Sequence, residues 1–166
     1  ESVLEWVGEP VLLYGHSAGA GAAVIAAWRR PEKVKLLFLE ACYADSREAL
    51  LSLYRWFNRF FGTAFGPMIL FWMNLFYRNR LKDVSPAKLA SSIRMPVMII
   101  HGAQDRRFPL EFALRLKACF PPEQSELFVA ENARHSESSL DPGYAAAVRG
   151  FIERHLDDSG GAQNSP

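Results

Sequence analysis

A serine stands between two glycines at the point where an apolar run gives way to small residues. The stretch VLLYGHSAGAGAAVIAA, residues 11–27, contains the motif Gly15-His16-Ser17-Ala18-Gly19, which has the pattern G-x-S-x-G. Between a strand and a helix, this pattern is typical of a nucleophile held on a sharp turn, with the N–H of Ala18 facing a developing oxyanion. The alternative is that Ser17 only begins the helix, because serine is a preferred N-cap residue.

The two glycines of this motif are predicted to have a steric role. A nucleophile turn brings neighbouring backbone segments close together, so we expect side chains at Gly15 and Gly19 to clash with them. The turn would lift the hydroxyl of Ser17 above the edge of the sheet.

A serine nucleophile also needs a base and an acid that orients the base. Asp105 follows the apolar run PVMII, and His135 follows the apolar run ELFV. Because the carboxyl ends of parallel strands meet at one edge of a sheet, we expect Ser17, Asp105 and His135 to converge there. Glu40, directly after the run VKLLFL, and Asp45 are competing acids. The plainer interpretations are a turn carboxylate for Asp105 and a surface-loop histidine for His135.

Apolar runs and helical patterns alternate along the chain. Strands are predicted at 11–14, 34–39, 96–100 and 126–129, and helices from Ser17 until Pro31, from Leu110 to Phe120 and from Tyr144 to Leu156. This alternation predicts an α/β fold with a mainly parallel sheet.

The stretch 43–93 has no strand pattern and is predicted to be a helical insertion. Residues 1–42 and 94–156 would then form the core, and the polar, Gly-rich residues 157–166 a disordered tail. The first half of the insertion has apolar residues at one continuous helical spacing, at positions Leu50, Leu53, Tyr54, Phe57, Phe60 and Phe61.

Composition excludes several classes of protein. A net charge of +1, with 49% hydrophobic and 22% charged residues, is typical of one globular domain and gives no electrostatic case for binding nucleic acid. The sequence has neither a metal-ligand cluster nor a phosphate-binding loop, so we expect no metal and no cofactor.

The cysteines and apolar runs bear on the compartment. Cys42 and Cys119 form neither a CxxC motif nor a disulfide framework, so we expect free thiols and a reducing, cytoplasmic location. No signal-peptide pattern is visible, and the longest apolar run, within 67–77, is too short to span a bilayer.

The order Ser17, Asp105, His135, with the motifs GHSAG, PVMIIHGAQD and RHSES, resembles the C-terminal part of the α/β-hydrolase superfamily. The stretch from Ser85 to Asp105 and the H-x-E-S at His135 are similar to the serine-aminopeptidase-like and prolyl-oligopeptidase-like branches. The resemblance covers residues 6–156. It implies a serine hydrolase with a Ser-His-Asp triad that cleaves an ester, thioester or amide, and its motifs are specific to the superfamily rather than to a substrate. The aromatic residues of the insertion favour a small or medium apolar acyl ester, as for a carboxylesterase, over a charged peptide.

The resemblance also implies that the insertion is a cap over the active site. An aromatic cap would form an apolar acyl pocket, for which the candidate residues are Phe57, Phe61, Phe65 and Trp72. Two alternatives are that the aromatic residues only pack the cap against the sheet, or that the segment Met68–Tyr77, flanked by Arg78, Arg80 and Lys82, touches a membrane surface.

Two features depart from the family pattern. The family has strands before the nucleophile strand, and a loop among them supplies a second oxyanion N–H; nothing precedes Glu1 here. Either the chain is a fragment, or a second copy covers the apolar edge of the strand at 11–14. Asn132-Ala133-Arg134 also stands where the family has a Gly-rich turn before the histidine. A non-catalytic hydrolase-like binding or scaffold module is therefore the alternative function.

Overall fold

The computed structural model describes residues 2–76 and 85–156. The predicted tail at 157–166, and Tyr77, Arg78, Arg80 and Lys82 of the predicted membrane-contact segment, lie outside the described residues.

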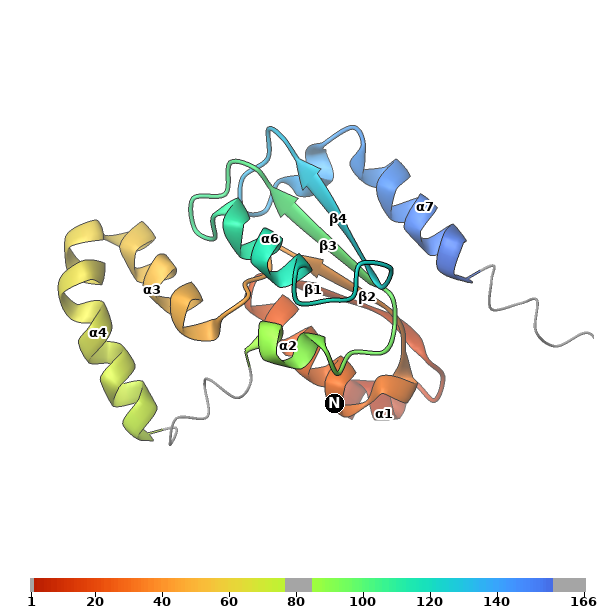
Figure 1. Ribbon diagram of the computed structural model, residues 1–166, viewed down its shortest axis with the longest axis horizontal. Coiled ribbons are helices and arrows are strands. Elements are labelled where there is room, and N and C mark those ends of the chain that lie inside the picture. Colours follow the sequence, from red (N-terminus) through yellow and green to blue (C-terminus); the bar gives the residue numbers. More distant parts are fainter. Residues whose placement is uncertain (1, 77–84, 157–166) are drawn as a thin grey trace, which may run out of the picture.

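Parallel strands form one four-stranded sheet in the order β1-β2-β3-β4 (Figure 1). The strands are β1 (Val11–His16), β2 (Val34–Glu40), β3 (Val97–Gly102) and β4 (Ser125–Ala130). Each is joined to the next by a connection that contains helix, as parallel pairing requires. The predicted α/β class and parallel sheet are confirmed.

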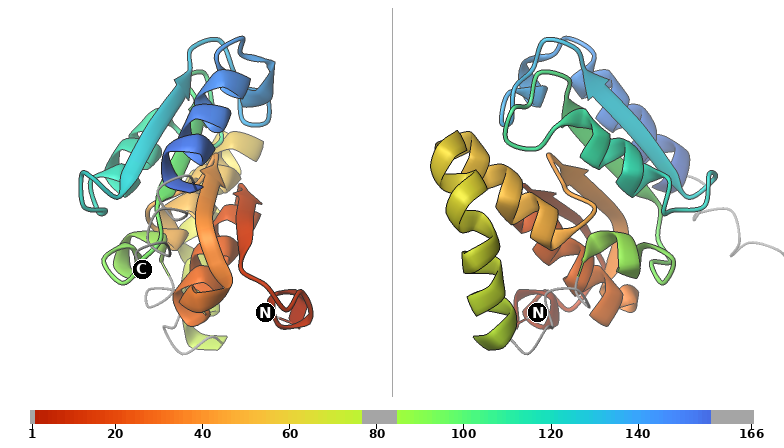
Figure 2. Two further views of the ribbon diagram at one scale, coloured as in Figure 1. Left: turned by 90° about the vertical axis from the view of Figure 1, so that its right-hand side faces the viewer. Right: turned by 60° about the vertical axis from the view of Figure 1, so that its left-hand side comes forward.

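Helices cover both faces of the sheet (Figure 2). α2 (Ala18–Arg29), α5 (Pro86–Ala90) and α6 (Leu110–Lys117) pack on one face, and α7 (Tyr144–Leu156) packs on the other. Alternate residues along the strands point to opposite faces of the sheet. Leu37 and Ile99 face α2 and α6, whereas Phe38 and Ile100 contact Phe151 of α7. The remaining short elements are α1 (Ser2–Trp6), which the sequence pattern did not predict, and the 3₁₀ turns η1 (Pro31–Lys33) and η3 (Ser138–Leu140).

β1 lies at the edge of the sheet, paired only with β2 among the described residues. Its side chains Leu12 and Tyr14 are 41% and 47% exposed. Coverage of this edge by another segment or by a second copy stays a prediction.

A pair of antiparallel helices, α3 (Ser46–Phe57) and α4 (Arg59–Phe76), lies beyond the carboxyl ends of the strands (Figure 1). The single helical spacing predicted through Phe61 is broken at Asn58. The backbone N–H of Asn58 donates to the carbonyl of Tyr54 (3.0 Å), and its side-chain Oδ1 accepts from the N–H of Phe61 (2.9 Å). Asn58 therefore ends α3 and caps α4, and the phenylalanines after it face new directions.

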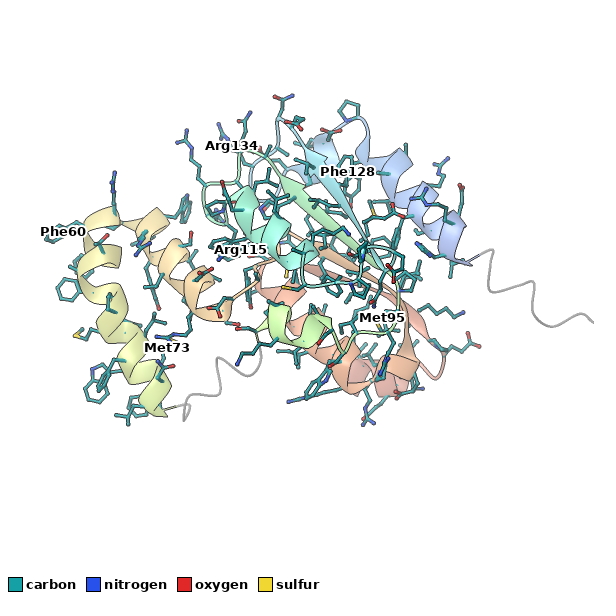
Figure 3. All side chains as sticks on the ribbon, viewed as in Figure 1. Phe60, Met73, Met95, Arg115, Phe128 and Arg134 are labelled. Carbon is teal, nitrogen blue, oxygen red and sulfur yellow. The ribbon has the colours of Figure 1, made fainter. Side chains whose placement is uncertain are left out.

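The outer surface of this helix pair is apolar. Gly62 lets the two helices approach closely, since a Cβ there would lie 2.5 Å from the backbone N of Arg55. The large side chains around it stay exposed, and Figure 3 shows Phe60 pointing outward from the start of α4. Residues 86–90 were predicted to belong to the insertion. Their side chains Leu89 and Ala90 are instead buried in the core beside α2.

None of the helices in the described ranges is both long enough and apolar enough to cross a membrane.

Candidate active site

Ser17 occupies the corner between β1 and α2. Its backbone has φ 54° and ψ −119°, a positive φ that a non-glycine residue adopts only where the surrounding structure enforces it. The N–H of Ser17 donates to the carbonyl of Glu40 at the end of β2 (2.9 Å), which ties the corner to the sheet. The side chain of Ser17 makes no capping hydrogen bond to α2, so the N-cap alternative does not describe it.

The two glycines of the motif differ in what surrounds them. A Cβ on Gly15 would lie 2.5 Å from the carbonyl oxygen of Gly19 and 2.6 Å from the Cα of Ala20, so this position excludes a side chain. A Cβ on Gly19 would meet no atom within 4 Å. The prediction that a side chain at Gly19 would clash is therefore wrong, because among the described residues nothing fills the space beside this glycine at the start of α2.

Three predicted residues meet at the carboxyl edge of the sheet. The Nε2 atom of His135 lies 2.8 Å from the Oγ of Ser17, and its Nδ1 atom lies 2.6 Å from Oδ2 of Asp105. Nδ1–H donates to the carboxylate of Asp105, which leaves the lone pair on Nε2 to accept the hydroxyl hydrogen of Ser17. The segments after β1, β3 and β4 thus bring Ser17, Asp105 and His135 into one hydrogen-bonded chain, the arrangement that a serine nucleophile needs.

The carboxylate of Asp105 is buried, and both of its oxygens accept hydrogen bonds. Its Oδ1 accepts the backbone N–H groups of Arg107 (2.8 Å) and Phe108 (3.0 Å), while Oδ2 accepts from His135. Burial alone would raise the pKa of Asp105, but these hydrogen bonds and the nearby imidazole outweigh it and hold the pKa below its usual value. Asp105 is therefore a stable anion that orients His135.

A second histidine lies beneath this pair. His101, on β3, is fully buried, and its Nε2–H donates to the carbonyl of Phe108 (2.8 Å). Burial lowers the pKa of His101 below its usual value, so the ring is neutral near neutral pH and does not neutralise Asp105. Phe108 also packs its ring edge-on against His135, with centroids 5.1 Å apart.

The two competing acids have other partners. The Glu40 carboxylate accepts the hydroxyl of Tyr14, and burial raises the pKa of Glu40. Asp45 caps α3 by accepting the N–H groups of Arg47 (2.8 Å) and Glu48 (3.1 Å). Neither is the acid that holds His135.

His16 has a contact that the motif alone does not reveal. Its Nε2 lies 3.0 Å from the backbone carbonyl of His135, to which it donates, and the two rings lie edge to face at 5.3 Å. His16 therefore ties the Ser17 corner to the His135 loop. The sequence gives no signal for this contact, because it joins loops 119 positions apart.

A cavity of about 420 Å³ adjoins Ser17. Its lining includes Ala18, the apolar side chains Ile25 of α2, Leu50 and Leu53 of α3 and Met73 of α4, and the rings of Tyr43 and Phe108. Residues of α3 and α4 therefore form part of the wall of the space beside Ser17, and the assignment of this helix pair as a cap stays a prediction.

The four aromatic residues predicted for this wall lie elsewhere. Phe57 and Phe61 line a separate cavity of about 330 Å³ between α3 and α4, and Phe65 and Trp72 are 38% and 48% exposed. The structure does not bring Phe57, Phe61, Phe65 or Trp72 to Ser17. Phe57 and Phe61 flank the turn at Asn58 between α3 and α4, and Phe65 and Trp72 are exposed on α4.

Both cysteines have free thiols. Cys42 is buried and free, and burial raises its pKa to about 12, which makes it a poor nucleophile; Cys119 is free and half-buried. Within residues 2–76 and 85–156, no cluster of three or more His, Cys, Asp or Glu side chains could hold a metal ion.

Solved structures share this architecture. An α/β hydrolase from a sediment metagenome of the Mar Chica lagoon, Morocco, superposes with a TM-score of 0.64 at 19% identity over 92% of this chain and 66% of its own. The esterase domain of a Rhodothermus marinus protein gives 0.63 at 20% identity over 89% of this chain and 61% of its own. A monoacylglycerol lipase from Paleococcus ferrophilus gives 0.61 at 19% identity over 94% and 72%.

The chain has the α/β-hydrolase fold. It spans 66% and 61% of the length of the first two of these α/β hydrolases. No family model and no curated protein matches the sequence. Within the fold, the closer likeness to the serine-aminopeptidase-like or prolyl-oligopeptidase-like branches stays a prediction.

The glycines provide a matched pair of variants. We expect Gly15→Ala to lower the free energy of unfolding by about 1–3 kcal/mol, because the added methyl group meets backbone that cannot move away. Gly19→Ala adds the same methyl group in open space and should leave the protein at least as stable. Urea unfolding of both variants measures the difference, and equal losses of stability would contradict the steric account.

The buried carboxylate predicts a dependence of stability on pH. Because the pKa of Asp105 is lower in the folded protein than its ordinary 3.8, its ionised form stabilises the fold above that pH, and this contribution is lost as the pH falls through the folded-state pKa. Asp105→Asn should therefore be less stable than the wild type near neutral pH, with the gap narrowing on acidification. Urea unfolding over this range tests it; a gap independent of pH would contradict the assignment.

Proposed function

We propose that the protein is a serine hydrolase that cleaves an ester, thioester or amide through an acyl-enzyme intermediate. The observation that carries the proposal is the hydrogen-bonded chain from Asp105 through His135 to Ser17, beside an apolar cavity. A serine hydroxyl is a weak nucleophile unless an oriented base removes its proton, and this chain supplies that base.

In the first half of the reaction, Oγ of Ser17 bonds to the substrate carbonyl carbon while Nε2 of His135 takes the hydroxyl proton. The tetrahedral intermediate collapses, the bond from carbon to the leaving group breaks, and His135 gives the proton to the leaving group. Asp105 holds the imidazole in the tautomer that this transfer needs and stabilises its protonated form.

In the second half, water attacks the acyl carbon of the acyl-enzyme. His135 takes a proton from the water and returns it to Ser17 as the carbon–Oγ bond breaks, so that a carboxylic acid leaves and the enzyme is restored.

The start of α2 provides one stabilising group for the negative oxygen of the intermediate. Ala18 is the first residue of this 12-residue helix, so its N–H has no acceptor within the helix. It adjoins Ser17 in the lining of the cavity, where the positive end of the helix dipole favours an anion. Ala18 N–H is therefore the assigned oxyanion donor.

The cavity lining favours an apolar acyl group. Ile25, Leu50, Leu53 and Met73 supply aliphatic walls, and a volume of about 420 Å³ has room for an acyl chain of medium length. A carboxylesterase-like activity on small acyl esters fits this lining better than cleavage of a charged peptide.

Hydrolysis of p-nitrophenyl acetate, butanoate, hexanoate and decanoate tests the proposal. We expect turnover that favours butanoate or hexanoate and falls in Ser17→Ala by about 10⁴-fold or more, because the nucleophile is lost. Ser139→Ala removes an exposed hydroxyl on η3 and should match the wild type.

Equal rates in wild type and Ser17→Ala, with both proteins folded by circular dichroism, would overturn the proposal. The chain would then be a hydrolase-like binding module.

A further inference from the structure

A second cavity, of about 460 Å³, lies on another side of the catalytic histidine. Its lining comes from three segments: Trp56 near the end of α3, Arg106 and Arg107 after β3, and Arg134, His135 and Glu137 after β4. Arg107 and His135 also line the cavity beside Ser17, so the two cavities meet at these residues.

Positive charge is concentrated around this second cavity. Three arginines and one glutamate line it, in a chain whose net charge is only +1. The Glu137 carboxylate accepts the backbone N–H of Arg134 (3.0 Å) rather than a guanidinium. Figure 3 shows Arg134 on the loop after β4, at the carboxyl edge of the sheet.

Three arginines outside this cavity have carboxylate partners. Arg30, Arg115 and Arg154 each form an ion pair with a glutamate. Within the part of the chain that the structure describes, no carboxylate lies within ion-pair distance of the guanidinium groups of Arg106, Arg107 or Arg134. These three groups therefore present donors that an anionic ligand could accept.

Arg107 is held in place before any ligand arrives. Its guanidinium lies 4.2 Å from the ring centroid of Trp56, and its backbone is fixed at both ends: the N–H donates to Asp105 and the carbonyl accepts from Ser52 (2.6 Å). A guanidinium stacked on an aromatic face keeps its edge donors available for a carboxylate. The loop that orients the catalytic acid thus also positions a cation.

We propose that this arginine-lined cavity binds a carboxylate carried by the leaving group of the substrate. The inference rests on the proposed hydrolase function: the acyl chain fills the apolar cavity beside Ser17, so the leaving group extends toward His135, which protonates it, and into the cavity on the far side. A monoanionic carboxylate fits better than a dianionic phosphate, because the carboxylate of Glu137 also faces the site. Trp56 adds apolar surface to this lining beside Arg107.

Two esters of similar shape, one with and one without this charge, test the proposal: the hexanoyl esters of 4-hydroxybenzoate and of 4-hydroxybenzamide, each rate being divided by that ester's rate of hydrolysis by hydroxide to remove the difference in leaving-group reactivity. We expect kcat/KM to favour the benzoate ester in the wild type. Arg106→Gln and Arg134→Gln should each reduce this preference by about three- to tenfold, since both groups are partly solvated. Arg149→Gln, an exposed arginine on α7, removes the same charge away from the site and should leave both rates unchanged.

Salt provides an internal check. Because exposed charges are screened over about 10 Å at 0.1 M salt and about 3 Å at 1 M, the preference should shrink as salt is added. A preference that neither the arginine variants nor salt changes would overturn the assignment.

Binding measured without turnover separates this proposal from the proposed function. Calorimetric titration of Ser17→Ala with 4-hydroxybenzoate and 4-hydroxybenzamide should show tighter binding of the anion, lost in Ser17→Ala combined with Arg106→Gln and Arg134→Gln. Equal binding of the two probes would overturn the carboxylate site even if both esters are hydrolysed. Hydrolysis of neither ester with tighter binding of 4-hydroxybenzoate would contradict the hydrolase function and support the anion site.

Discussion

Parallel pairing of the strands is the constraint on which the rest of the structure depends. His16 pairs with Glu40, Glu40 with Ile100, and Gly102 with Ala130, so all the strands end along one edge. The segments that follow the strands therefore meet at this edge: the Ser17 corner after β1, the Asp105 loop after β3 and the His135 loop after β4. A shift of one strand by a single residue would turn its alternating side chains to the opposite faces and displace the loop that it carries.

The ionisable groups at this edge of the sheet differ in pKa because their surroundings differ. Asp105 is kept ionised by donated hydrogen bonds, while burial keeps His101 neutral beneath it and raises the pKa of Glu40 beside it. Only one buried carboxylate therefore orients the imidazole of His135. The arginines of the second cavity add positive charge beside His135 at the same edge.

Local sequence signals predict the strands and the α/β class. They also predict where Ser17, Asp105 and His135 lie, because each follows an apolar run that forms a strand, and the strands end along one edge of the sheet. Contacts that depend on helix orientation could not be predicted in this way. Phe57 and Phe61 flank the turn that Asn58 makes between α3 and α4, and the wall predicted for aromatic residues is formed by aliphatic Leu50, Leu53 and Met73. Two further contacts join residues far apart in the sequence and could be found only in the folded structure. His16 contacts the His135 loop, and Trp56 contacts Arg107.

Labelling with a fluorophosphonate tests most directly whether Asp105 and His135 activate Ser17. The Oγ of an activated serine displaces fluoride from phosphorus, and mass spectrometry of the digested protein identifies the modified residue. The account predicts a single phosphonylated position, Ser17, and a labelling rate lower by about 10²- to 10⁴-fold in His135→Gln. Labelling of Ser17 at the same rate in His135→Gln, or no labelling of Ser17 in the folded wild type, would contradict it.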